Sequence, residues 1–103
     1  MKIIEILSEK IEEEVCDAKS YIKLAIDYKE EYPELSRTLY NLSTQEMEHM
    51  NLLHNEVTEI IKRYRETKGD PPADMMAVYE YLHKKQIEKA TDVKIMQNMY
   101  KES

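Results

Sequence analysis

A glutamate and a histidine interrupt an apolar stripe in the middle of the chain. The stripe follows residues 35–64 at the three- and four-residue spacing of an α-helix, and Glu46 and His49 occupy two of its positions. Residues three apart share one face of a helix, one turn from each other. A carboxylate and an imidazole placed in this way can ligate a single metal ion, and the pair suits iron or manganese, and also zinc.

A second carboxylate, Glu14, interrupts the apolar stripe of the first helical segment. A buried glutamate is costly unless it is paired or bound to a cation. If the chain reverses at the Tyr32-Pro33 pair, Glu14 lies within ~5 Å, measured along the helix axis, of the midpoint between Glu46 and His49. The spacing therefore predicts that the three side chains converge on one site.

Simpler interpretations compete with a metal site. Residues 43–46 (Ser-Thr-Gln-Glu) match a capping box, which would start a helix there without any metal, although the leucines before it are in phase with the later stripe. A Glu-x-x-His pattern also arises by chance in a glutamate-rich chain, and a second copy joins Glu80 to His83. Glu14 and His49 could also pair with each other across a helical hairpin.

Three long helical segments position these residues, and they predict an all-α fold in a single domain. The domain covers residues 1–103, with helices over about residues 3–31, 34–68 and 72–101. Pro33 can open the second helix at its first position, and Gly69 is a natural residue to end it. The second break is short, so the third helix is expected to turn back against the second helix or to project outward.

Composition and charge exclude several classes of protein. The chain has 21 acidic and 15 basic residues and a net charge of −6, whereas a nucleic-acid-binding protein should carry a basic face. A single cysteine, Cys16, allows no disulfide within the chain and no cysteine-based zinc site, and we expect it to be a packed thiol. We identify no signal peptide and no membrane-spanning segment, so the expected compartment is the cytoplasm.

The pattern of candidate ligands resembles a known family. Glu14 followed seven residues later by Tyr21, with Glu46-x-x-His49 in the next helix, is similar to the first half of the rubrerythrin and ferritin-like group. The resemblance covers roughly residues 3–66. It implies a carboxylate-bridged di-iron centre inside a four-helix bundle, with Glu14 as a carboxylate ligand, Glu46 as the bridging carboxylate and His49 as a terminal imidazole. Tyr21 would supply a hydroxyl that steadies one of the ligands.

This chain departs from the family in two respects. It has no Cys-x-x-Cys iron domain, and its hairpin supplies only half of the six ligands. Glu80 and His83 lie roughly 18 Å along the axis from the expected centre, too far to complete it within one chain. A two-fold homodimer solves the problem, because two hairpins make one four-helix bundle, as in the similar short encapsulated ferritins. The third helix would then brace the bundle or build higher assemblies.

The expected function follows from the resemblance. It implies a protein that binds Fe(II) and oxidises it with dioxygen or peroxide, as ferroxidases and peroxidases do, and no acid or base beyond the ligands is identifiable. The alternative is a non-catalytic helical assembly module with ferritin-like architecture. For His54, Glu80 and His83 we expect a structural or interface role, with an additional metal site as the alternative.

Overall fold

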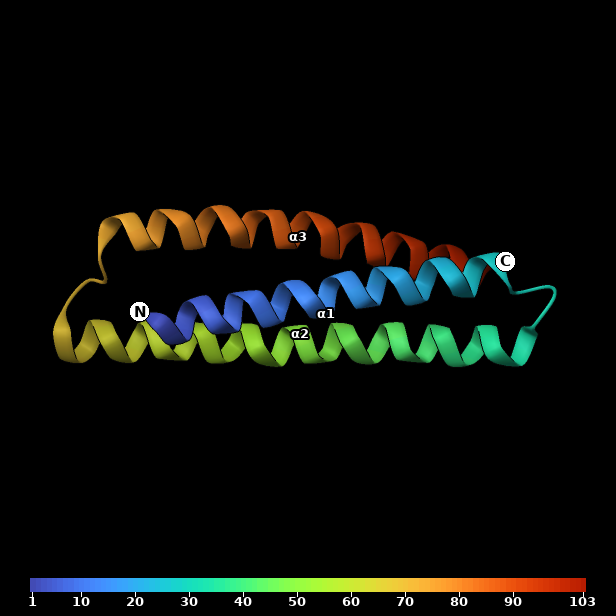
Figure 1. The fold of residues 1–103 in the computed structure, drawn as a ribbon, viewed down its shortest axis with the longest axis horizontal. Helices are drawn as coiled ribbons and strands as arrows, with labels where there is room; N and C mark the ends of the chain where they lie inside the picture. Colours follow the sequence, from blue (N-terminus) through green and yellow to red (C-terminus); the bar gives the residue numbers. More distant parts are fainter.

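Three long helices make up almost the whole chain. A computed structural model describes all 103 residues, and its helices are α1 (Lys2–Asp27), α2 (Pro33–Lys68) and α3 (Ala73–Glu102), with no strand. The molecule is a rod of 55 × 19 × 18 Å in which α1 and α2 are antiparallel and α3 returns in the direction of α1 (Figure 1). The predicted all-α class is therefore confirmed.

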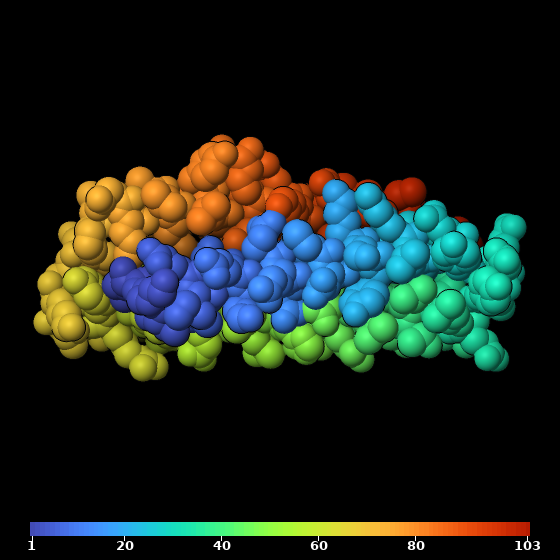
Figure 2. Space-filling model, viewed as in Figure 1, coloured from blue at the N-terminus to red at the C-terminus, as the bar shows by residue number.

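The third helix lies mainly against α1. Helix α1 packs along both of the other helices, whereas α2 and α3 contact each other at few points. In the space-filling view α1 lies between the other two helices along much of the rod (Figure 2). The expectation that α3 would turn back against α2 was wrong, because the buried stripe of α1 is wide enough to serve two neighbours.

The stripe predicted for α1 forms the centre of the core. Its buried residues recur every three or four positions, as on one face of a helix: Ile4, Ser8, Ile11, Val15, Ala18, Ile22 and Ala25. The last three of them share an apolar cluster with Met47 of α2 and with Ala90 and Val93 of α3. The small alanines let all three helices approach one another at this end of the rod.

Two buried serines join α2 to α1. Ser36 and Ser43 are fully buried, and their hydroxyl groups donate hydrogen bonds to the carbonyl oxygens of Ala25 and Ala18, the latter over 2.7 Å. Since α2 is continuous from Pro33 to Lys68, the capping-box interpretation of Ser43 is wrong. The serine instead contributes a small side chain and a cross-helix hydrogen bond to the interface.

The helix boundaries differ slightly from the expected ones. Helix α1 ends at Asp27 rather than near residue 31, and a turn follows in which the amide of Tyr32 donates to the carbonyl of Tyr28 over 2.8 Å. The chain needs these residues to cross from one helix axis to the next before Pro33. Gly69, with φ of 84°, ends α2, as predicted.

Helix α3 begins at Ala73, after Pro72, and none of the three helices is long and apolar enough to cross a membrane. Polar contacts along its length fix α3 to its neighbours. The side chain of Gln86 donates to the Ser8 carbonyl over 3.2 Å, and Lys89 forms an ion pair with Glu12. Both contacts lie on one edge of the α1 stripe, so α3 covers that edge and leaves the other edge open.

Candidate metal centre

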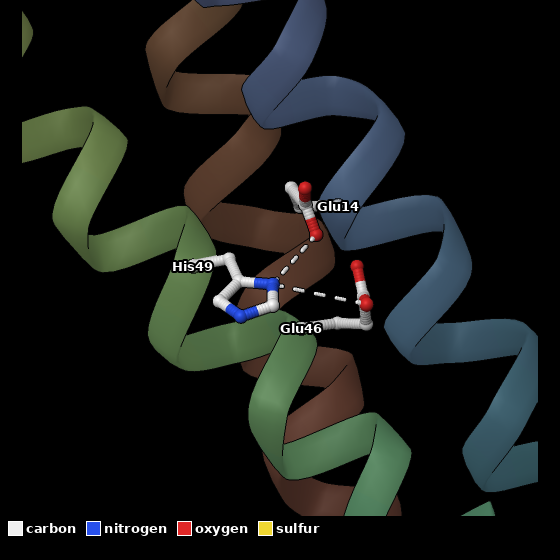
Figure 3. A group of neighbouring side chains, drawn as sticks. All are labelled: Glu14, Glu46 and His49. Atoms are coloured by element: carbon white, nitrogen blue, oxygen red, sulfur yellow. Dashed lines mark ion pairs between the residues drawn. The ribbon is translucent and has the colours of Figure 1, made fainter.

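Glu14, Glu46 and His49 lie together between α1 and α2. One ligand atom from each side chain lies within 4.8 Å of those of the other two. The Nδ1 atom of His49 is 3.5 Å from Oε2 of Glu14 and 3.8 Å from Oε1 of Glu46 (Figure 3). The juxtaposition predicted from the spacing is therefore confirmed, and it depends on the antiparallel pairing of the two helices.

The local sequence explains where each side chain points. Glu14 directly precedes buried Val15, and Glu46 directly precedes buried Met47, so both carboxylates project from the edge of a buried stripe. The side chains of Glu46 and Glu14 are 19% and 25% exposed, whereas that of His49 is 53% exposed. The two carboxylates thus line the groove, and the imidazole covers them from the solvent side.

The site faces away from the third helix. Figure 3 shows α3 behind α1 and α2, with the three side chains in front of the ribbons. On α1, the contacts with α3 use Ser8 and Glu12, on the edge opposite to Glu14. Helix α3 therefore leaves the mouth of the site open to solvent or to another molecule.

The two carboxylates strongly perturb each other. Proton sharing with Glu14, burial and the charge of Glu14 together raise the pKa of Glu46 from its ordinary 4.5 to about 7, although His49 opposes the shift. The Oε2 atom of Glu14 is shielded from solvent and accepts no hydrogen bond. Two close carboxylates with an unpartnered oxygen and a neighbouring imidazole are a donor set that fits a divalent cation such as iron.

Tyr21 lies near this cluster without bonding to it. The tyrosine is half-buried on α1, two turns beyond Glu14 and on the same edge of the helix. Its hydroxyl forms no hydrogen bond with the three candidate ligands. The role of Tyr21 in steadying a ligand stays a prediction.

The other candidate residues lie elsewhere. The ring of His83 stacks on His54 at 4.3 Å and on Tyr79 at 5.7 Å, between α2 and α3, while Glu80 is exposed. None of them joins the carboxylate cluster, in agreement with the axial distance expected from the sequence. Cys16 is exposed rather than packed, and its thiol lies 3.6 Å from Oε1 of Glu12, so that expectation was wrong.

An apolar surface surrounds the candidate centre, and the sequence reasoning missed it. We define the open face as the half-buried residues on the uncovered edges of the two helices: Leu7, Glu14 and Tyr21 of α1, and Leu42, Glu46 and Leu53 of α2. The residues of each helix are spaced by four or seven, which places them on one side. The signal was present, because leucines flank Glu46 at both spacings, but only the position of α3 shows that this side is uncovered.

Comparisons with known proteins add no family. No family model matches the chain, and no curated protein and no solved structure matches it either. The ferritin-like resemblance therefore rests on the quoted residues and on their geometry.

Proposed function

We propose that this chain is a ferritin-like metal-binding protein with a di-iron centre at a homodimer interface, where Fe(II) is oxidised by dioxygen or peroxide. The observation that carries the proposal is the convergence of Glu14, Glu46 and His49 around an unpartnered carboxylate oxygen. A carboxylate pair with a raised pKa, held in a groove, is typical of a functional site.

The dimer follows from what one chain lacks. A carboxylate-bridged di-iron centre takes six ligands from four helices, and one hairpin supplies three ligands from two helices. The open face carries these ligands at its centre and apolar side chains on both sides, so a second copy can bury the leucines while it adds its own three ligands. A two-fold contact of one face with itself is the commonest symmetry among oligomers.

Each residue has a defined part in this arrangement. Glu46 would bridge the two ions, while Glu14 and His49 would each bind one of them. Bound iron supplies reversible one-electron chemistry. Near neutral pH the carboxyl group of Glu46 holds a proton in the metal-free protein, and it releases this proton to become a ligand. His49, the most exposed of the three, shields the carboxylates from solvent.

Anaerobic titration of the metal-free protein with Fe(II), followed by exposure to air, tests the proposal. We expect saturation at about two irons per dimer and an oxo-bridged ferric absorbance band in the near ultraviolet. The band should be lost in Glu46→Ala and kept in Glu48→Ala, a matched control at an exposed position two residues away on the same helix. A folded dimer that binds no iron would contradict the metal centre.

The second candidate function is a non-catalytic helical assembly module. It is favoured by the 3.5 Å approach of His49 to Glu14, which an ion pair across the hairpin would explain without metal. The two functions predict opposite effects of Glu14→Ala on thermal stability in the absence of metal. Loss of an ion pair lowers the melting temperature, whereas loss of one of two crowded carboxylates raises it.

A further inference from the structure

A second group of potential ligands lies in the groove between α2 and α3. A cavity of about 680 Å³ opens there, and its lining includes His54 of α2 together with Glu80 and His83 of α3. On the other side of the two histidines lies a smaller cavity of about 190 Å³, so both rings border open space. The groove is separate from the carboxylate cluster, and the proposed iron chemistry makes no use of it.

The two imidazoles face each other without polar partners. Their rings are nearly parallel, at 7°, and their centroids are 4.3 Å apart. The Nδ1 atom of His54 is shielded from solvent and has no hydrogen-bond partner, and no carboxylate forms an ion pair with either ring. A buried polar atom without a partner costs free energy, so these residues are not explained by packing alone.

Glu80 completes a recognisable donor set. It precedes His83 by three residues, so the two side chains share one face of α3, and both line the cavity that His54 borders from α2. Two imidazoles and one glutamate are the protein ligands of many zinc sites that keep a fourth position open. Lys62 and Arg65 also line the cavity, and Glu66 and Glu80 balance their charge.

We propose that His54, Glu80 and His83 form a second metal site, for a divalent cation of the zinc class, that joins α3 to α2. The unpartnered imidazole nitrogen, the paired rings and the shared cavity carry this inference. It requires a modest rotation of the stacked rings so that one nitrogen of each points at the same ion. Because α2 and α3 otherwise touch at few points, a shared ion would bind the free edge of α3 to the hairpin.

Cobalt(II) titration of the full chain tests this site, in a Glu46→Gln/His49→Ala background that removes the ligands of the first centre. We expect one Co(II) per chain and the visible absorption of a four-coordinate ion. The absorption should disappear in His83→Ala and weaken in Glu80→Gln. It should be unchanged in Glu88→Gln, an exposed control on the same helix. Absence of the absorption in the background variant, or its persistence in His83→Ala, overturns the proposal.

Thermal unfolding gives a second measurement that does not depend on a spectrum. Zn(II) should raise the melting temperature of the background variant and should have no effect once His83→Gln is added, with circular dichroism to verify that each variant is folded. The rise should vanish below about pH 6, because protons compete with the ion for the imidazoles. Equal stabilisation with and without His83 contradicts the site.

Discussion

The two clusters of ionisable side chains in this molecule resist opposite charges. Between α1 and α2, Glu46 keeps a proton well above its ordinary pKa because Glu14 is beside it. Between α2 and α3, burial and then repulsion from His54 lower the pKa of His83, so this ring takes up a proton less readily. The first cluster therefore avoids negative charge and the second avoids positive charge.

This difference shows how one cation could suit both places for different reasons. At the carboxylates a cation neutralises repulsion between like charges, and at the imidazoles it occupies lone pairs that no hydrogen bond uses. In the metal-free protein the same features store unfavourable free energy, and the sign of its pH dependence should differ between the two clusters. The predictions below use that difference, and the largest expected effect comes first.

Disrupting the open face should have the largest effect, because the carboxylate cluster depends on a second chain and the histidine pair does not. Leu42 lies one turn before Glu46 on this face, and we expect Leu42→Glu to weaken the dimer by about 100-fold or more, since it places a charge within an apolar contact. Iron oxidation should be lost together with the dimer, while Co(II) binding at His83 should persist. Analytical ultracentrifugation and the two titrations measure these outcomes.

A matched control lies close by on the same helix. Leu52 is 65% exposed, and Leu52→Glu should leave both the dimer and iron oxidation unchanged. If Leu42→Glu stays dimeric and active, the two-chain centre is wrong, and the three ligands of one hairpin must act alone.

The next effect concerns the carboxylates in the metal-free protein. Unfolded Glu46 loses its proton near its ordinary pKa of 4.5, whereas folded Glu46 keeps it to about 7. Between these values the folded state binds more protons than the unfolded state, so stability should fall as pH rises from about 5 to 8. The loss should reach about 2 kcal/mol, less than the full linkage of the shift because the side chain keeps some contact with water.

Urea unfolding of the metal-free protein at several pH values measures this loss. Glu46→Gln should remove most of the pH dependence, since the amide cannot ionise, and Glu48→Gln serves as the control at an exposed position on the same helix. An unchanged slope in Glu46→Gln would mean that the two carboxylates do not share a proton.

Particular residues show how much of this arrangement the sequence could predict. The helical stripe from Ile4 to Ala25 predicted the buried face of α1, and its interruption at Glu14 predicted the partner of Glu46 and His49, because helical spacing fixes axial height as well as direction. Sequence spacing could not place α3, since the path of a short linker does not reveal which neighbour the third helix will meet. For the same reason the uncovered side of the hairpin and the His54 and His83 stack could not be predicted.

The smallest effect should come from the histidine pair, with the opposite sign. Unfolded His83 takes up a proton near its ordinary pKa of 6.5, whereas the folded ring resists protonation because it is partly buried and faces His54. Below that pH the unfolded state binds more protons, so the metal-free protein should lose stability as pH falls through about 6.5. Lys62 and Arg65 border the same cavity and add to the repulsion, while Glu66 and Glu80 reduce it.

This acid effect is best measured in Glu46→Gln, because the carboxylate contribution increases stability over the same range of pH. The melting temperature of this variant should fall between pH 7 and pH 5.5, and the fall should be smaller in Glu46→Gln/His83→Gln. His54→Gln should also reduce it, since the second ring is one source of the repulsion. An equal fall with and without His83 would show that the imidazoles ionise freely, and the contrast between the two clusters would then reduce to the carboxylates alone.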